Sequence, residues 1–474
     1  MANITKSSRP GYLDPVATPL EPDKRERETL NAAILQYLDD WYEQAATMPA
    51  SGVDLDPSVA AKLALPPSEG GRSLSEILED LGAAGQSGVL HPSGGHLSYI
   101  PNGGLYTAAL AEFLAAGLNR YTGVAGAAPG MSAIEHGVVS WMTSLFEMGD
   151  KASGLMLSGG SLANFTAIVA ARTSKLDDDL TKGVLYLTAH THHSVAKAAR
   201  LAGFRDDQIR GVAVDAELRM EPEALAAAVE QDRNEGRMPF MVVGSAGTTD
   251  TGTVDPLWDL GEISAAHELW LHIDGAYGGF FQLTERGSTR LTGIERADSI
   301  SIDPHKGLSI PFGNGALLVR DESYLIDANQ GRGAYLLAED SHSGLRDIAA
   351  LGPELSRPFR GLQVWLPLHL HGIAPFRDAL DDALDLAESA YDRLSGIQGV
   401  DAPWRPDLSI VAFRFSDDDQ GRAAMEAINR ERFVHVSPTV VGGRFVLRFA
   451  ILNRRTTSDH IDHAIDIIEK TLVG

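Results

Sequence analysis

The stretch GLMLSGGSLANFTAIVAAR (residues 154–172) joins a short apolar run, GLMLS, to the helical pattern of LANFTAIVAAR through a Gly-Gly turn. The same order recurs further along the chain, in GVLYLT (183–188) before SVAKAARLAG (194–203), in FMVVGSAG (240–247) before WDLGEISAAHE (258–268), and in the further β-like runs WLHID (270–274) and SISID (299–303). Short β-rich runs that alternate with helices predict βαβ units, and hence a mostly parallel α/β sheet with helices on both faces. Because ligands of such sheets bind at the carboxyl ends of the strands, the loops that follow these runs should lie together.

A helical arm is expected before the sheet. Residues 1–22 are rich in Pro, Ser and Thr and are typical of an extended segment. From Asp23 a helical pattern begins, and its apolar residues form one stripe: Leu30, Ile34, Leu38, Trp41 and Ala45. A one-sided stripe needs a surface to cover. We assign residues 1–90 to this N-terminal arm and residues 91–370 to the large domain.

A small α+β domain is expected after the sheet. A long helix is predicted over residues 375–394, and it is followed by β-like runs at 408–415, 433–437 and 445–452 that alternate with helical stretches. About a hundred residues are enough for a separate small domain. We assign residues 371–474 to it.

Composition excludes several classes of function. The 474 residues include 40 Lys and Arg against 64 Asp and Glu, a formal net charge of −24. Such an acidic chain repels phosphodiester backbones and anionic membranes, which argues against a nucleic-acid or membrane partner. The chain has no cysteine, so disulfides and thiolate chemistry are excluded. No apolar run approaches the roughly 18 residues that cross a bilayer, and a cytoplasmic protein is expected.

The segment Ser301–Leu308 (SIDPHKGL) is the densest cluster of reactive side chains. Most lysines lie on solvated faces, but Lys306 follows a predicted strand and precedes the apolar LSIPFGNGALLV. An amine in a partly dry site loses its proton more easily and then forms a Schiff base with an aldehyde.

A carboxylate stands at the end of the preceding β-like run. Asp274 ends WLHID and precedes Gly275-Ala276-Tyr277-Gly278-Gly279. It either caps a turn, which is common, or keeps a pyridine nitrogen protonated, as a pyridoxal phosphate electron sink requires.

Two further turns carry polar groups. Ser158-Gly159-Gly160-Ser161 lies between a predicted strand and helix, where free N–H groups attract a phosphate. No G-x-G-x-x-G or P-loop pattern is present, which disfavours a nucleotide. His190 and His192 are spaced to share a metal, but no Asp, Glu or Cys nearby completes a ligand set. An imidazole stacked on a planar cofactor is the better interpretation, and we expect no metal.

HIDGAYGG around Asp274, followed by Asp303-Pro304-His305-Lys306, resembles the group II pyridoxal-phosphate decarboxylases, which include the aromatic L-amino-acid, histidine and glutamate decarboxylases. The resemblance covers almost the whole chain and implies fold type I. The segments HLSYIP (96–101), AAPGMSAIE (127–135), SLAN (161–164) and LRFAILNRRTT (447–457) support it.

This resemblance implies a role for individual residues. Lys306 would form the Schiff base with pyridoxal phosphate, Asp274 would pair with the ring nitrogen, and His192 and Ala276 would cover the two faces of the ring. Gly160, Ser161 and His305 would hold the phosphate, and Thr248 would approach the polar edge of the cofactor. The family commonly has Asn where this chain has Asp303, and a carboxylate there would be repelled by a phosphate. The N-terminal helices of the family usually wrap a partner subunit, so a homodimer is expected.

The implied reaction is decarboxylation of an L-amino acid to the amine. Oxidative deamination to an aldehyde is the alternative, and transamination is less favoured; a cofactor-free assembly protein is a rival from another class. Tyr99 and Pro101 would belong to the substrate pocket, which favours aromatic substrates. Small residues follow at 122–126, so the pocket is either wide or filled from a partner, and Arg120 is the residue to examine for an acidic substrate.

The acid that protonates the α-carbon is not obvious from the sequence. In the family a loop over residues 327–356 often supplies a tyrosine, but Ile348 stands near that position. Tyr335 is the only tyrosine of the segment, and it is either the acid or a solvated loop residue; His192 or His342 would otherwise take the role. Without a good acid, oxygen would intercept the carbanion and give the aldehyde.

Overall fold

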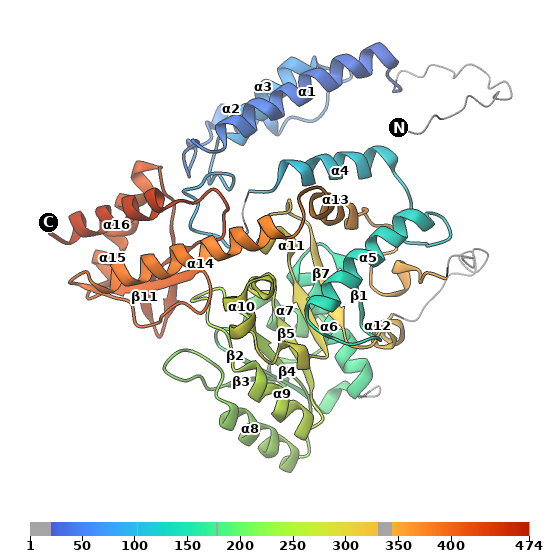
Figure 1. Cartoon of the computed structure of the whole chain (residues 1–474), viewed down its shortest axis with the longest axis vertical. Helices are drawn as coiled ribbons and strands as arrows, with labels where there is room; N and C mark the ends of the chain where they lie inside the picture. The colour runs from blue at the N-terminus through green and yellow to red at the C-terminus, as the bar shows by residue number, and fades with distance from the viewer. Residues whose placement is uncertain (1–19, 102, 177–178, 330–343, 474) are drawn as a thin grey trace. The chain divides into compact units, whose positions relative to one another are not determined.

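The computed structural model describes residues 20–101, 103–176, 179–329 and 344–473 (Figure 1). The contacts between residues divide the chain into two compact units. The first contains the described residues up to Ala46 together with Val53–Gly88, and the second contains Thr47–Gly52 and everything from Val89 onward. The predicted division at residues 90 and 370 stays a prediction.

The first unit is helical, as the sequence predicts. It consists of α1 (Lys24–Gln44), α2 (Pro57–Leu63) and α3 (Leu74–Gly85). Asp23 caps α1 by accepting a hydrogen bond from the backbone of Glu26, whose side chain bonds back to the Asp23 backbone. This reciprocal capping fixes where the helix begins. Within the described part of this unit, none of the three helices contains a buried residue.

A seven-stranded sheet forms the centre of the second unit. Its strands lie in the order β1-β7-β6-β5-β4-β2-β3. The pairs from β6 to β3 are parallel, whereas β7 runs antiparallel to both β6 and β1. The strands are β1 (Ser153–Leu157), β2 (Gly183–Thr188), β3 (Ile209–Val212), β4 (Met238–Ser245), β5 (Trp270–Asp274), β6 (Ser299–Ile302) and β7 (Gly315–Val319). This confirms the α/β fold with a mostly parallel sheet.

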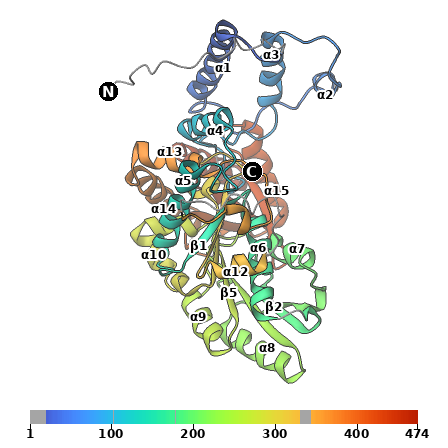
Figure 2. The same cartoon turned by 90° about the vertical axis from the view of Figure 1, so that its right-hand side faces the viewer.

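Helices cover both faces of this sheet (Figure 2). One layer contains α5 (Pro129–Leu145), α8 (Pro222–Asn234) and α9 (Leu257–Ala266), and the other contains α6 (Gly160–Lys175), α7 (His193–Leu201) and α12 (Ser323–Ala328). Successive strand residues enter opposite hydrophobic cores, because side chains of a strand alternate between its faces. Met156, for example, packs with the first layer and Leu157 with the second.

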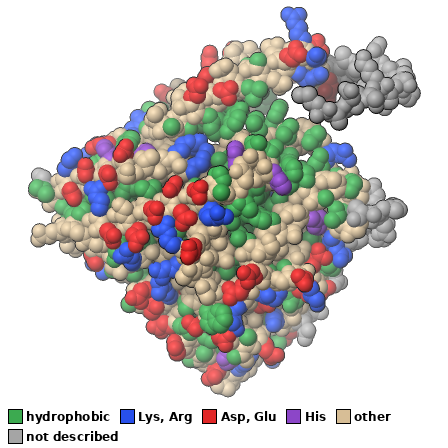
Figure 3. All heavy atoms as spheres, viewed as in Figure 1, with side chains coloured by type: hydrophobic (Ala, Val, Ile, Leu, Met, Phe, Trp, Pro, Cys, Tyr) green, Lys and Arg blue, Asp and Glu red, His purple; other side chains and the backbone are tan. Residues whose placement is uncertain are grey.

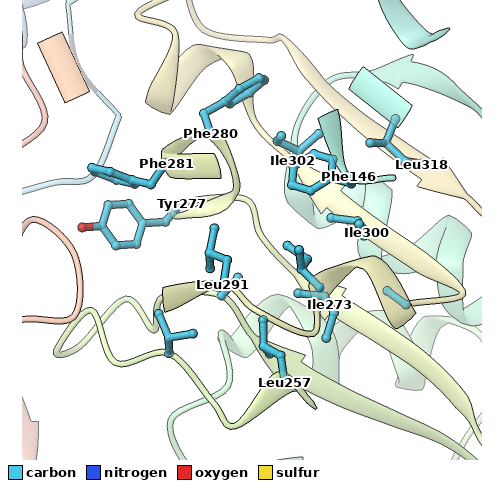
Figure 4. Close-up of a cluster of buried hydrophobic side chains, with 14 of the residues drawn as sticks. Phe146, Leu257, Ile273, Tyr277, Phe280, Phe281, Leu291, Ile300, Ile302 and Leu318 are labelled. Atoms are coloured by element: carbon cyan, nitrogen blue, oxygen red, sulfur yellow. The ribbon is translucent and has the colours of Figure 1, made fainter. Parts of the chain in front are cut away.

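The first of these cores extends beyond the sheet. In Figure 4, Ile273, Ile300 and Leu318 point from three neighbouring strands toward one cluster. Tyr277, Phe280 and Phe281 join it from the segment that follows β5. This packing fixes the backbone directly after Asp274. Around it stand α4 (Tyr106–Leu118), α10 (Glu285–Arg290), α11 (Pro304–Gly307) and α13 (Gly361–His371).

The C-terminal part of the second unit has its own antiparallel sheet, in the order β10-β11-β9-β8. Three helices pack against it or against one another to form a separate hydrophobic cluster. The elements are α14 (Ala374–Ser395), β8 (Val400–Asp401), β9 (Ile410–Phe415), α15 (Asp418–Glu431), β10 (Ser437–Val441), β11 (Arg444–Ala450) and α16 (Ser458–Val473). The predicted α+β composition is confirmed.

The predicted strand at 433–437 is wrong. Strand β10 begins only at Ser437, and His435 instead forms an isolated bridge with His96. Its backbone bonds to Gly95 and Leu97, in a segment rich in turns that offers no ladder to continue. Strands β3 (Ile209–Val212) and β7 (Gly315–Val319) were not expected from the sequence.

Candidate functional site

A cavity of about 260 Å³ lies at the carboxyl ends of the parallel strands. Its lining residues come from the loops after β1, β2, β4, β5 and β6, the loops that the sequence places together. All eight residues predicted to bind the cofactor line this one cavity: Gly160, Ser161, His192, Thr248, Asp274, Ala276, His305 and Lys306. Side chains far apart in the sequence are therefore brought to one place.

Asp274 is the last residue of β5 and is only 7% exposed. Its carboxylate accepts hydrogen bonds from Asn164 Nδ2 at 3.0 Å, from Ser301 Oγ at 3.1 Å and from the Ala276 backbone N–H at 3.2 Å. Burial by itself would raise the pKa of Asp274, but the nearby amine of Lys306 and the hydrogen bond from Asn164 counteract burial, and the pKa lies below its ordinary value. Asp274 is therefore a buried, ionised carboxylate, as a partner of a protonated ring nitrogen must be.

Lys306 lies in α11, directly after β6. Its Nζ is 3.0 Å from Oδ2 of Asp303, whose side chain is 2% exposed. His305 Nε2 lies 3.6 Å from the same oxygen, and His305 Nδ1 bonds to the Asn314 carbonyl at 2.6 Å. Burial is the main reason why the pKa of His305 is lowered. Asp303 is thus an ion-pair partner of the lysine, which accounts for a carboxylate at this position.

The Gly159-Gly160 turn brings the start of α6 against the cavity. Gly159 adopts a φ of +152°. A Cβ on Gly160 would lie 2.9 Å from the Cβ of Ala276 and 3.3 Å from Oδ2 of Asp303. Only glycine leaves room here, and the free N–H groups of the first helical turn face a site for an anion. An amine, a buried carboxylate and this anion-binding turn in one cavity fit pyridoxal phosphate.

His192 caps the start of α7. Its Nδ1 lies 2.7 Å from Ser194 Oγ and also accepts from the Ser194 backbone N–H at 3.4 Å. Burial lowers the pKa of His192. The capping bonds fix the orientation of the ring, and His192 lines the cavity together with Asp274 and Lys306.

The predicted substrate residues lie apart from the cofactor residues. Tyr99 is 50% exposed, and neither it nor Pro101 is among the described residues that line the cavity. The ring of Tyr99 lies 6.0 Å from the rings of both His91 and His96. Phe312 continues this group of rings, 5.3 Å from His91 and 6.1 Å from His305 of the cavity.

The other candidate residues are not among the described residues that line the cavity. Tyr335 and His342 lie outside the described residues. Ile348 is 3% exposed and packs in the hydrophobic core that contains α6, so the chain presents no proton donor at that position. The Arg120 side chain is exposed and donates to the Ala127 carbonyl. Within the described ranges, no cluster of His, Asp and Glu side chains suits a metal ion, and no helix is apolar and long enough to span a bilayer.

Sequence reasoning missed two residues beside Asp274. Asn164 entered the sequence analysis only as part of the segment SLAN (161–164), but its amide donates to Asp274, and His272 bonds to that amide at 2.9 Å. Residues four apart on a helix and two apart on a strand share a face. The spacing of Asn164 from Gly160, and of His272 from Asp274, was the available signal.

The buried ring of His96, which is 1% exposed and lies beside the rings of His91 and Tyr99, leads to a prediction about pH. Burial, with His91 and His435 nearby, lowers the pKa of His96 from 6.5 to about 3. Between these values the unfolded chain binds a proton that the folded chain does not, so the free energy of unfolding falls as the pH falls from 6.5 toward 3. We expect His96→Gln to flatten this slope in urea titrations at several pH values. His193→Gln, at an exposed position, is the control; equal slopes in the native protein and both variants would contradict the prediction.

Comparisons with known proteins find a matching family and relatives over most of the chain. A family model described as the pyridoxal-dependent decarboxylase conserved domain matches residues 61–416. The chain is 34% identical over 404 residues to the aromatic-L-amino-acid decarboxylase of Bacillus atrophaeus, an alignment that covers 83% of this chain and 84% of that protein.

Two solved structures share the fold. The crystal structure of Oryza sativa TDC with PLP and tryptamine matches with a TM-score of 0.90 at 24% identity, over 96% of this chain and 99% of that one. The structure of Rhodiola rosea 4-hydroxyphenylacetaldehyde synthase matches over the same shares, with a TM-score of 0.88 and 24% identity.

Proposed function

The chain belongs to the pyridoxal-dependent decarboxylase family, and from that membership we propose that it converts an aromatic L-amino acid to the corresponding amine and carbon dioxide. Its cofactor is pyridoxal phosphate. The observation that carries the proposal is the single cavity in which the buried carboxylate of Asp274 and the amine of Lys306 meet the Gly159-Gly160 turn. When bound, the cofactor supplies an aldehyde for amine exchange and a ring that accepts the electron pair released with carbon dioxide.

The residues of this chain have separate tasks in the proposed site. Lys306 provides the amine that holds the aldehyde carbon, and the N–H groups at the start of α6, with Ser161 and His305, hold the phosphate. Asp274 keeps a proton on the ring nitrogen, since three donors fix its carboxylate in the charged form. Ala276 and His192 cover the ring, and Thr248 reaches its polar edge. Tyr335 and His192 are the proposed proton donors to the α-carbon.

The preference for an aromatic substrate rests on two observations. The ring group of His91, His96, Tyr99 and Phe312 leads to His305 in the cavity wall, and aromatic rings favour contact with other rings. The Bacillus atrophaeus relative is an aromatic-L-amino-acid decarboxylase.

The test is a panel of L-amino acids, assayed for carbon dioxide, amine, aldehyde and hydrogen peroxide. We expect kcat/KM for Trp, Tyr or Phe to exceed that for Glu or 2,4-diaminobutyrate by at least about a hundredfold. A polar substrate side chain makes no ring contacts with this group of aromatic residues, and it loses its own hydration on binding. Amine should match carbon dioxide in amount. Faster release from an acidic or basic amino acid would refute the aromatic assignment, and aldehyde with peroxide in place of amine would refute the amine product.

We also propose a homodimer. On the face shown in Figure 3, hydrophobic side chains gather over α4 and α13, where Phe113, Leu114, Leu118 and Leu370 are all at least 47% exposed. A contiguous apolar surface of this kind is typical of a subunit interface.

Replacing Phe113 by Glu should therefore shift the protein toward the monomer, because the dimer would bury an unpaired charge. Sedimentation velocity at micromolar concentration measures the shift. Leu201→Glu, at an exposed position on α7, is the matched control. A native protein that sediments as a monomer would refute the proposed dimer.

A further inference from the structure

The amide of Asn164 joins three polar groups inside the protein. It lies in the second turn of α6 and is 1% exposed. Its Nδ2 donates to Asp274 Oδ2 at 3.0 Å and to Ser194 Oγ at 3.1 Å, while its Oδ1 accepts from His272 Nε2 at 2.9 Å. A carboxylate only accepts, so the nitrogen of the amide must face Asp274. The orientation of the amide is thereby fixed.

This orientation determines the proton positions on His272. Asn164 Oδ1 needs a donor, so Nε2 of His272 carries a proton. Burial lowers the pKa of His272 to about 4, so the ring is neutral and its Nδ1 is an acceptor. The Ser299 hydroxyl, 2.8 Å away, then donates to Nδ1, and it accepts in turn from the indole N–H of Trp270 at 2.8 Å. An indole nitrogen can only donate, which agrees with this direction.

The donor and acceptor roles along these hydrogen bonds also determine the state of His192. Because Ser194 Oγ accepts from Asn164, its own proton is free for His192 Nδ1, 2.7 Å away. The Ser194 backbone N–H also points at this Nδ1. Nδ1 of His192 is thus an acceptor twice over, and a neutral His192 carries its proton on Nε2.

We propose that Asn164 is a positioning residue that holds Asp274 as a carboxylate and, through Ser194, fixes His192 as the tautomer protonated on Nε2. His192 then presents a donor, and no acceptor, to a molecule in the cavity. Asp274 at the end of β5 and His192 at the start of α7 are coupled by one amide. The part of His192 in the reaction rests on the proposed function, whereas its tautomer belongs to the protein alone.

The tautomer can be measured without turnover. Apoprotein labelled with ¹⁵N-histidine gives separate nitrogen signals for protonated and bare ring atoms, and the signals of His192 are those lost in His192→Gln. We expect a protonated Nε2 in the native protein. Ser194→Ala should raise the ratio of the Nδ1-protonated to the Nε2-protonated form of His192 by about fivefold, since one hydrogen bond of about 1 kcal/mol is lost. Ser194→Thr, which keeps the hydroxyl, should retain the native tautomer, and His272 should be unchanged in both.

A second variant tests the branch to Asp274. Asn164→Asp keeps the shape of the side chain but removes both N–H donors, and it faces Asp274 with a second carboxylate. We expect the dissociation constant for pyridoxal phosphate, from fluorescence titration of the apoprotein, to rise at least about tenfold, the effect of one charged hydrogen bond. An unchanged dissociation constant would refute this branch.

The outcomes separate the two proposals. A native apoprotein with the proton of His192 on Nδ1, or an unchanged tautomer in Ser194→Ala, overturns the positioning role whatever the activity. A native tautomer in a protein that releases no carbon dioxide from any amino acid refutes the proposed function and leaves the positioning role standing. If Asn164→Asp does not fold, the Ser194 pair still decides the coupling to His192.

Discussion

Lys306→Ala should lose decarboxylation by a factor on the order of 10⁴, with the fold intact. The loss is large because the lysine provides the only amine described in the cavity lining, and without it neither capture of the cofactor aldehyde nor release of product has a nucleophile. Carbon dioxide release and a borohydride-reducible adduct, measured by mass spectrometry, should disappear together. Lys197→Ala, which removes an exposed lysine of α7, should keep both.

The loss of activity in Lys306→Ala must be distinguished from a loss of folding. Lys306 is paired with Asp303, and its removal leaves a buried carboxylate without that partner, so thermal unfolding must be measured beside turnover. Full decarboxylation by a folded Lys306→Ala protein would disprove the assigned role.

Asp274→Ala should slow decarboxylation by at least about a hundredfold, the usual effect of removing one fixed electrostatic contact to a reacting group. The buried carboxylate is held by Asn164, Ser301 and the Ala276 backbone, so the replacement removes a negative charge that is fixed at that position. Asp274→Asn should be nearly as slow although it has the same shape, because the lost property is the charge. Stopped-flow and steady-state rates, with retained cofactor from absorbance, measure both effects.

The matched control is Asp206→Asn, which neutralises an exposed carboxylate paired with Arg200. It should leave rate and cofactor content unchanged. A native rate in Asp274→Asn would mean that the charge at this position does not serve the chemistry.

The sequence was sufficient for the parts of the site that stand directly at strand ends. Asp274 ends one β-rich run and Lys306 follows another, and parallel strands bring their carboxyl ends to one edge, so these residues could be placed together without coordinates. The strands β2 and β5 were predicted with the observed bounds, because each is an unbroken apolar run between clear turn signals.

The missing parts depend on contacts that no local pattern encodes. Asn164 and His272 look like ordinary helix and strand residues, and their role follows only from the meeting of α6 with β5. The residues of β7 were interpreted from the sequence only as part of the apolar segment that follows Lys306. The strand runs antiparallel because only a short connection joins α11 to it. Tyr99 was assigned to the substrate pocket by resemblance, whereas its neighbours His91 and His96 became visible only in three dimensions.

Two hydrogen bonds between the segment after β5 and the residue before β9 have a thermodynamic consequence. The hydroxyl of Tyr277, in the cavity wall, bonds to both the side chain and the backbone N–H of Ser409, one residue before β9. Opening of β9 therefore also releases the wall of the cavity. Any molecule that occupies the cavity must slow hydrogen exchange in β9 by linkage, although no β9 residue is described in the cavity lining. The exchange rates of the β9 amide protons should therefore report whether the cavity is occupied.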